Sequence, residues 1–344
     1  MQLADVRLAA LVPCLPDERV ASEALEARLA PLYERLRLHS GRLQLMSGIA
    51  ERRFWPAGTR PSGPASAAGR RALQEAGVEP AAVDLLIHAS VCRDFLEPAT
   101  ASVVHHTLGL APHAVLFDLS NACLGFANAL LIAAAQIDAG QIETALVVAC
   151  EDGRPLVDAT VQALLANPHA GKDELKRAFA SLTIGSGAAA AVLVRGARAP
   201  LAPRLLGGRV LAATEHHVLC HGDHAGAGAG PLMETDSEAL LHAGIDLAAR
   251  TWPLLLHELG WSGAPDRIVT HQVGVAHRRA LLGALDIPPE LDFPTVETLG
   301  NMGSVSLPLT LALAREAGHI RRGHRVGALG IGSGLSCLML GLEF

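Results

Sequence analysis

The fold is decided by a segment that occurs twice in the chain, first as SNACLGFANALLIAAAQIDAG at residues 120–140. Its polar start runs into a long apolar stretch, a pattern typical of a buried helix. Cys123 precedes Gly140 by the same number of residues as Asn301 precedes Gly318 in the second half of the chain. We therefore expect two equivalent helices, with Cys123 and Asn301 at equivalent starts.

The sequence around these two helices repeats as well. The stretch EAGVEPAAVDLLIHAS at 75–90 is echoed by ELGWSGAPDRIVTHQ at 258–272, and each predicted helix is followed by an apolar strand, at 144–150 and 325–330. Each half then closes with IGSG and a further apolar run. Helices that alternate with short strands predict an α/β fold made of two duplicated halves, with largely parallel strand pairing.

The two halves are predicted to comprise residues 1–196 and 205–344, because a stretch rich in proline and glycine lies at 195–208. The first half contains an extra segment at 151–183, which is expected to be helical. The expected breaks in it are Pro155, Pro168 and Gly171. An insertion at such a junction is typical of a lid, a channel wall or a dimer contact; the alternative is a solvated excursion without function.

One helix start in the second half is predicted in detail. Thr235 and Glu238 have the spacing of a capping box, in which the two side chains accept from each other's backbone N–H groups. Apolar residues continue at helical spacing to about Leu259. The sequence therefore predicts a long helix with Thr235 as its cap.

Composition excludes several classes of protein. Of the 344 residues 50% are hydrophobic, which is enough for a large core and argues against disorder. The net charge is −6 and aromatic residues make up 3%, so neither the basic surface nor the stacking side chains of a nucleic-acid-binding protein are expected. The uncharged run at 119–137 contains polar residues and lacks an aromatic belt, so we expect a buried helix and no transmembrane segment.

The cysteines and the first residues indicate a cytoplasmic protein. The six cysteines are far apart and form no C-x-x-C pair, so reduced thiols are expected. The opening MQLADVRLAALVPCL carries acidic and basic residues among its apolar ones, which is poor for a signal peptide.

Cys123 is the first candidate for chemistry. At a helix N-terminus, unpaired N–H groups and the helix dipole favour the thiolate and lower the pKa of a cysteine. We therefore expect a reactive Cys123 with a lowered pKa; the alternative is a small buried residue without a chemical role.

Four segments, DLSNACLGF, IVTHQVG, LGNMGSVSLP and LGIGSGLSC, resemble four motifs of the thiolase superfamily, in its ketoacyl-ACP synthase III-like branch. They resemble the motifs of the nucleophile, the histidine, the asparagine and the C-terminal glycine loop. The resemblance implies a five-layered αβαβα fold, a homodimer, acyl-CoA substrates, and Cys123, His271 and Asn301 as the catalytic trio.

The trio that the resemblance implies is suited to thioesters. Cys123 would be acylated while its own N–H and that of Ser333 hold the oxyanion. His271 and Asn301 would bind the carbonyl oxygen of a second thioester and stabilise its enolate. No cofactor other than the CoA thioester substrate is then expected. A strand-end histidine and a helix cap are the structural alternatives for His271 and Asn301.

Glu97, in the segment CRDFLEPATAS at 92–102, indicates which type of condensation reaction to expect. The resemblance places it in the partner's pocket, where decarboxylating relatives usually carry an apolar side chain. A carboxylate there could abstract an α-proton. The segment looks most like the OleA type, which condenses two long-chain acyl-CoAs to a β-keto acid in olefin biosynthesis. A decarboxylating 3-oxoacyl-ACP synthase III that uses malonyl-ACP or malonyl-CoA is the alternative, as is a plain surface role for Glu97.

The sequence does not define which residues bind the CoA part of the substrate as clearly as it defines the catalytic candidates. The arginine that the branch uses near the CoA adenine falls at about Met46, and its asparagine after the histidine motif is Gly274. Arg52 and Arg53 are candidates for the CoA phosphates, with solvated surface arginines as the alternative. Further partners that we consider are an acyl carrier protein and downstream pathway enzymes.

A metal site and two other classes compete with this interpretation. A zinc site is disfavoured because the clustered donors lack the paired spacing of known sites. These donors are Glu215, His216, His217, Cys220, His221 and His224. A catalytically dead subunit would be expected to lack the nucleophile, and neither IGSG serine lies in the G-x-S-x-G elbow of a serine hydrolase.

Overall fold

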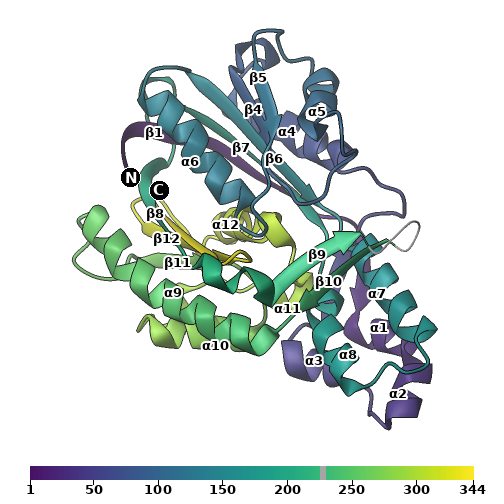
Figure 1. Ribbon diagram of the computed structural model, residues 1–344. Helices are drawn as coiled ribbons and strands as arrows, with labels where there is room; N and C mark the ends of the chain where they lie inside the picture. Colours follow the sequence, from purple (N-terminus) through teal and green to yellow (C-terminus); the bar gives the residue numbers. More distant parts are fainter. Residues whose placement is uncertain (225–229) are drawn as a thin grey trace.

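The computed structural model describes residues 1–224 and 230–344, and its centre is a nine-stranded sheet in the order β11-β12-β13-β8-β1-β7-β6-β4-β5 (Figure 1). The two halves of the chain meet in this sheet where β1 pairs with β8. The strands of the sheet are β1 (Gln2–Cys14), β4 (Leu85–His88), β5 (Val115–Asp118), β6 (Thr144–Glu151), β7 (Gly187–Arg195), β8 (Arg204–Ala212), β11 (Arg267–Thr270), β12 (Arg325–Gly332) and β13 (Ser336–Glu343).

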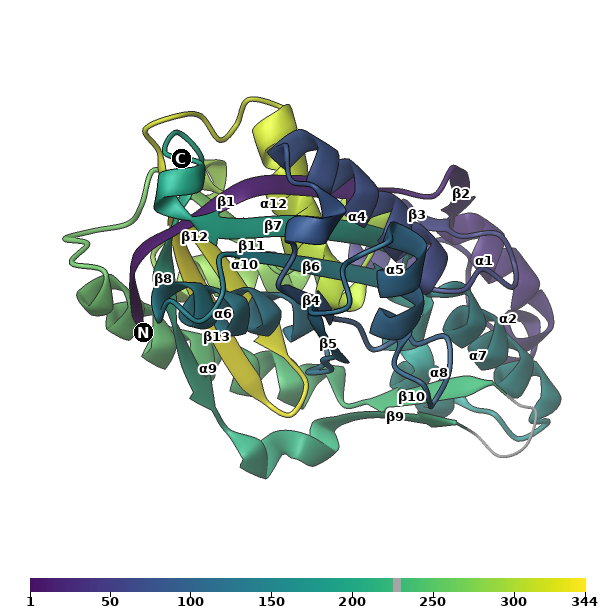
Figure 2. The ribbon, with the colours of Figure 1, turned by 90° about the horizontal axis from the view of Figure 1, so that it is seen from above.

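Three pairs of helices complete the layers. They are α4 (Ser62–Ala76) with α5 (Thr100–Leu108), α6 (Gly125–Asp138) with α12 (Ser306–Glu316), and α9 (Ser237–Glu258) with α10 (Val275–Ala284). Figure 2 shows α4 and α5 on one side of the first-half strands, with α6 on the other. The core packs α4 and α5 on the outer face of β4, β6 and β7, and α9 and α10 on that of β12 and β13. The αβαβα architecture is therefore confirmed.

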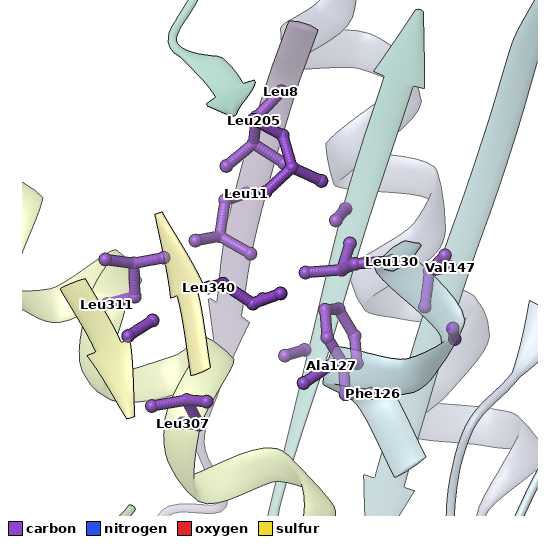
Figure 3. Close-up of a cluster of buried hydrophobic side chains, with 14 of the residues drawn as sticks. Leu8, Leu11, Phe126, Ala127, Leu130, Val147, Leu205, Leu307, Leu311 and Leu340 are labelled. Atoms are coloured by element: carbon purple, nitrogen blue, oxygen red, sulfur yellow. The ribbon is translucent and has the colours of Figure 1, made fainter. Parts of the chain in front are cut away.

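The middle layer contains the largest core cluster. Phe126 and Leu130 of α6 and Leu307 and Leu311 of α12 pack with β-strand side chains from both halves, among them Leu340 (Figure 3). Burial of each such side chain contributes about 1.5–3 kcal/mol. The run of small side chains in β7, GAAAAVLVR, lets helices pack closely on both of its faces.

The prediction of largely parallel pairing is wrong. Parallel pairing is confined to the two ends of the sheet, in β4–β5, β4–β6 and β11–β12. The pairs β6–β7, β7–β1, β1–β8, β8–β13 and β13–β12 are antiparallel. The physical reason is visible at β12 and β13, because residues 333–335 between them are too short for the crossover that parallel strands require.

The insertion at 151–183 is helical, as predicted. It forms α7 (Arg154–Ala166), α8 (Lys172–Ala178) and the 3-10 helix η2 (Phe179–Thr183). The break predicted at Pro155 is wrong, because Pro155 lies in the first turn of α7, where proline is tolerated. The breaks predicted at Pro168 and Gly171 are confirmed, since both residues lie between α7 and α8. These helices share a small core with α1 (Ser22–Arg28), α2 (Ala30–Leu36) and β3 (Glu51–Phe54). Strand β3 pairs with β2 (Glu18–Ala21).

The capping box predicted at Thr235 is wrong. Thr235 is the last residue of β10 (Pro231–Thr235), which pairs with β9 (Cys220–His224). Asp236 caps α9 instead, because its carboxylate accepts from Ala239 N at 3.0 Å.

The remaining elements are short. They are α3 (Arg42–Ser47), α11 (Val296–Leu299), η1 (Pro80–Ala82), η3 (Gly196–Arg198), η4 (Thr214–Leu219), η5 (Pro289–Leu291) and η6 (Gly303–Val305). In the described part of the chain, none of the helices has the length and apolarity needed to cross a membrane.

Candidate active site

Cys123 lies two residues before α6, on a turn that touches the end of β12. Ala122 has a positive φ of 44°, and Leu124 is the N-cap of the helix. A Cβ atom placed on Gly332 would lie 3.0 Å from Leu124 Cγ and 3.5 Å from Cys123 Cβ. Only glycine allows the two segments to come this close. The turn with Ser333 therefore stands beside the cysteine, where a second oxyanion N–H is expected.

The thiol of Cys123 does not have the lowered pKa that its place near a helix start predicts. Burial raises its pKa to about 12, and the neighbouring Cys220 and Glu151 act in the same direction. The cost of removing water from around a thiolate exceeds the stabilisation by the helix terminus. The resting residue is therefore a protonated thiol.

His271 directly follows β11 and is held against β12. Its backbone N–H donates to Leu329 O at 2.8 Å, and the residue is 2% exposed. Among the described residues neither ring nitrogen has a hydrogen-bond partner. Burial lowers the imidazole pKa to about 3, so the ring is neutral and can donate one N–H to a substrate oxygen.

Sequence reasoning missed His277, a half-buried histidine close to His271 whose Nδ1 is buried without a hydrogen-bond partner among the described residues. Its proximity contributes to the lowered pKa of His271, and burial lowers its own pKa to about 4. It lies in the first turn of α10, outside every motif, and its proximity to His271 is a tertiary property that no sequence pattern signals.

Asn301 is held by its backbone and by its side chain. Its N–H donates to Thr183 O at 3.0 Å, and its carbonyl oxygen accepts from Gly185 N at 2.8 Å. Its Oδ1 accepts from Gly303 N at 3.0 Å. Because that bond occupies the side-chain oxygen, the Nδ2 group is left to donate to a ligand.

These segments converge at the start of α6. A Cβ atom on Gly125 would lie 3.6 Å from Cβ of Ser304, which follows Asn301 by three residues. The turn that carries Asn301 therefore contacts the same end of α6 as the turn that carries Gly332 and Ser333. His271 is bonded to β12 three residues before Gly332. The structure therefore brings the turns that carry Cys123, Asn301 and Ser333 together and holds the His271 segment on the adjoining strand.

Glu97 lies on an exposed loop, 91–99, between β4 and α5. Its carboxylate makes no hydrogen bond or ion pair with the residues that the structure describes. The neighbouring Leu96 is 93% exposed and Val91 is 54% exposed, while Arg60 lies over the ring of Phe95 at 4.8 Å. The loop thus presents apolar side chains and one carboxylate outward from its own subunit.

The prediction that Arg52 binds CoA phosphates does not fit its environment. Arg52 is fully buried, and its guanidinium donates to Ser22 Oγ at 2.9 Å and to Leu182 O at 3.0 Å. Burial lowers its pKa to about 10. Arg53 is half-buried, donates to Pro16 O at 3.0 Å and borders a surface cavity of about 450 Å³. Arg53 stays a prediction.

The histidine-rich segment lies on η4 and β9. Cys220 Sγ accepts from Thr235 Oγ1 at 3.4 Å, and His216 borders a surface cavity of about 620 Å³ with His242 and Asp246. Among the side chains that the structure describes, which do not include that of His224, no three histidine, cysteine or acidic groups are placed to hold a metal ion. All six cysteines are unpaired.

Comparisons with known proteins agree on one family. Residues 117–203 match the family 3-oxoacyl-[acyl-carrier-protein (ACP)] synthase III, and residues 261–343 match 3-oxoacyl-ACP synthase III C terminal. The chain is 42% identical to an acyl-CoA:acyl-CoA alkyltransferase of Shewanella oneidensis, over 94% of this chain and 95% of the relative. It is 37% identical to that of Xanthomonas campestris pv. campestris, over 98% of each.

A crystal structure from Xanthomonas campestris is also similar to this chain. It is OleA with a cysteine-to-serine substitution, with bound lauric acid and lauroyl-CoA. The TM-score is 0.93 at 36% identity, and the match covers 99% of this chain and 100% of the other.

Proposed function

Because the chain belongs to the OleA family of acyl-CoA:acyl-CoA alkyltransferases, within the 3-oxoacyl-ACP synthase III-like enzymes, we propose that it joins two acyl-CoA thioesters without decarboxylation. The product after hydrolysis is a β-keto acid. The observation that carries the proposal is the meeting of the Cys123 turn with the Gly332 turn and the Asn301 turn at the start of α6.

The first half of the reaction uses the Cys123 side of this site. The sulfur attacks the carbonyl carbon of one acyl-CoA and forms the S–acyl bond to Cys123, while the bond from that carbon to the CoA sulfur breaks and the thiol proton of Cys123 passes to the departing CoA. The N–H groups of Cys123 and Ser333 stabilise the oxyanion. The protonated resting thiol limits side reactions until a substrate is bound.

The second half of the reaction uses the His271 and Asn301 side. The neutral imidazole and the free Nδ2 group donate to the carbonyl oxygen of the second acyl-CoA, and Glu97 removes its α-proton. The resulting carbanion attacks the acyl-enzyme, which forms the carbon–carbon bond and releases the Cys123 sulfur. Water then cleaves the remaining thioester, which gives the β-keto acid and a second free CoA.

A homodimer in which Glu97 acts in the partner's pocket is part of this proposal. Strand β5 is the last strand of the sheet, and its first residue, Val115, is 59% exposed. The outward apolar side chains of loop 91–99 belong to the same half. Unpaired strand edges and exposed apolar groups of this kind are typical of an interface between subunits.

The proposal extends to the substrates and the compartment. A long acyl chain is supported by the lauroyl-CoA bound to the Xanthomonas OleA variant. Unpaired cysteines support a cytoplasmic enzyme, and the proposed reaction needs only CoA thioesters and water. An acyl carrier protein as acyl donor, downstream enzymes that consume the β-keto acid, and Arg53 as a phosphate contact belong to the same proposal.

The test is incubation with lauroyl-CoA as sole substrate. We expect release of free CoA and a β-keto acid, or the ketone formed from it, by mass spectrometry. Glu97→Gln should lose about 10²–10⁴-fold in condensation and retain acylation of Cys123, because only the second step needs the base. Glu79→Gln, a change at another exposed glutamate of the first half, is the matched control and should be unaffected.

Two outcomes would contradict the proposal. If product forms only after malonyl-CoA or malonyl-ACP is added, and Glu97→Gln keeps the full rate, the enzyme is a decarboxylating synthase. For the dimer, inactive Cys123→Ala and Glu97→Gln subunits are mixed, and one working site per heterodimer is expected. Absence of recovery after confirmed exchange would rule out action across the interface.

A further inference from the structure

Glu151, the last residue of β6, anchors the start of the loop that carries Glu97. Its side chain is buried, with the residue 5% exposed. Its Oε1 accepts from Val91 N at 2.9 Å, and its Oε2 accepts from Cys92 N at 3.1 Å. One carboxylate therefore holds the first two backbone N–H groups of loop 91–99.

The same carboxylate joins the loop to the second half of the chain. Ser304 Oγ lies 2.7 Å from Oε1, and Ser304 N donates to the same oxygen at 3.4 Å. No ion pair of the described residues includes Glu151. A buried carboxylate without a cation depends on such donors, so loss of one leaves a polar group unsatisfied.

The far end of the loop is held in a similar way. Asp118 accepts from Thr100 N and Ala101 N, both at 2.8 Å, at the start of α5. Between the two anchored ends, Phe95, Leu96 and Glu97 are exposed. Asp94 is a third anchor within the loop, because its Oδ1 accepts from Ser62 N at 2.9 Å and its N–H donates to Thr100 Oγ1 at 3.1 Å. Glu151 is the anchor at the start of the loop, and it is the one that also contacts the Asn301 turn through Ser304.

We infer that Glu151 is a positioning residue for the condensation step, which holds loop 91–99 so that Glu97 reaches the α-carbon of the second acyl-CoA. This inference rests on the proposed function, in which Glu97 is the base. The position of Asn301 depends less on Glu151 than the position of loop 91–99 does, because Asn301 has its own hydrogen bonds to Thr183, Gly185 and Gly303.

Glu151→Gln is the informative variant. Val91 N and Cys92 N bond to opposite oxygens, so the amide NH₂ of glutamine must face one of these donors and release it. Misplacement of a catalytic group by about 1 Å costs about 10²-fold, so we expect a condensation loss of this order. Acylation of Cys123 should stay near the wild-type rate. A parallel loss of acylation would overturn the inference.

Asp152→Asn is the matched control. Asp152 is the next residue, and its carboxylate accepts from Arg154 N and Ser186 Oγ rather than from the loop. It should leave the ratio of condensation to acylation unchanged. If it lowers that ratio as Glu151→Gln does, the effect belongs to this corner of the fold in general and the inference fails.

A double variant tests whether Glu151 acts through Glu97. When the base is already absent, its position no longer matters, so Glu97→Gln with Glu151→Gln should condense as slowly as Glu97→Gln alone. If the two losses multiply, Glu151 acts elsewhere and the inference is wrong. If Glu97→Gln alone has no effect on condensation, the proposed function fails first, and the loop has no base to position.

Subunit mixing gives a readout that a general folding defect would not. Glu151→Gln subunits should recover condensation with Cys123→Ala subunits, which supply an intact loop, and should not recover with Glu97→Gln subunits. The reverse pattern would assign Glu151 to its own subunit's site, and recovery with neither would indicate a damaged fold. Either result overturns the inference. The pair Cys123→Ala with Glu97→Gln is the reference for exchange.

Discussion

Helices α6 and α12 end alike and begin differently. After α6, Gly140 has φ 71° and Gln141 N bonds back to Gln136 O at 3.0 Å. After α12, Gly318 has φ 72° and His319 N bonds back to Ala314 O at 2.9 Å. This is the same C-terminal motif in both halves, with glycine where the chain is left-handed.

The starts of the two helices differ in backbone and in chemistry. Cys123 stands two residues before α6 on a turn with a positive φ at Ala122. Asn301 is followed by the 3-10 helix η6 before α12 begins. The duplication thus preserves the helix ends that only shape the fold, whereas the helix starts have diverged. The proposed function assigns the nucleophile to one start and an oxyanion donor to the other.

The largest effect is expected at the Cys123 end. Cys123→Ala should remove both partial reactions, because no acyl-enzyme can form without the sulfur. Intact-protein mass spectrometry after incubation with lauroyl-CoA should show one added acyl group on wild type and none on the variant. Cys14→Ala, at another half-buried cysteine, is the control. Acylation of Cys123→Ala would show that the nucleophile lies elsewhere.

At the Asn301 end, only the second partial reaction should fail. Asn301→Ala removes one donor to the enolate oxygen, and such a loss costs about 10²–10³-fold in rate. Condensation should fall by this amount while acylation of Cys123 continues, as measured by single-turnover mass spectrometry. Asn167→Ala, at the exposed end of α7, should change neither rate. If Asn301→Ala lowered the rates of acylation and condensation equally, the prediction that the Asn301 end acts only in condensation would be wrong.

The histidines at the ends of equivalent strands should make the enzyme acid-sensitive. Burial lowers the pKa of His88 to about 4 and that of His271 to about 3. Below pH 6.5 the unfolded chain binds protons that the folded chain does not, so stability falls as pH decreases. Each histidine should cost about 2 kcal/mol at pH 5.

Urea unfolding at pH 7 and pH 5 measures this loss for wild type, His88→Gln and His271→Gln. Each variant should lose less stability between the two pH values than wild type does. A variant that keeps the full wild-type loss would show that its histidine is not held neutral, and the two strand ends would then differ in burial.

The smallest effect is expected on stability, and it should be the same for the glycines that end α6 and α12. Gly140→Ala and Gly318→Ala each place a side chain in a left-handed conformation, at a cost of about 1 kcal/mol in free energy of unfolding. Gly283→Ala, inside α10 and without close neighbours, should be neutral or stabilising. Clearly unequal costs at Gly140 and Gly318 would mean that the two helix ends are not structural equivalents.

Local patterns in the sequence were sufficient to predict most elements. The strands at 144–150 and 325–330, the helical insertion and the repeat itself follow from spacing within short windows. The direction of strand pairing could not be predicted in this way, because β1 pairs with strands nearly two hundred residues away. The cap of α9 moved by one residue, since Thr235 pairs in β10 and leaves the capping to Asp236.

At the site, motifs indicated residues but not their environments. The pKa of Cys123 depends on burial by segments from both halves, and the burial of Arg52 depends on Ser22 and Leu182. Glu151 was not singled out because its donors, Val91, Cys92 and Ser304, come from distant parts of the chain. Such properties arise only when the chain is folded.

The central place of β1 constrains how this protein is made. A ribosome produces β1 long before its neighbours β7 and β8, which begin at Gly187 and Arg204. An apolar strand must therefore wait for more than half of the chain before it can pair. Until then its unpaired edges are open to other chains. We expect the yield of folded enzyme to depend on chaperones and on the pace of synthesis more strongly than its final stability suggests.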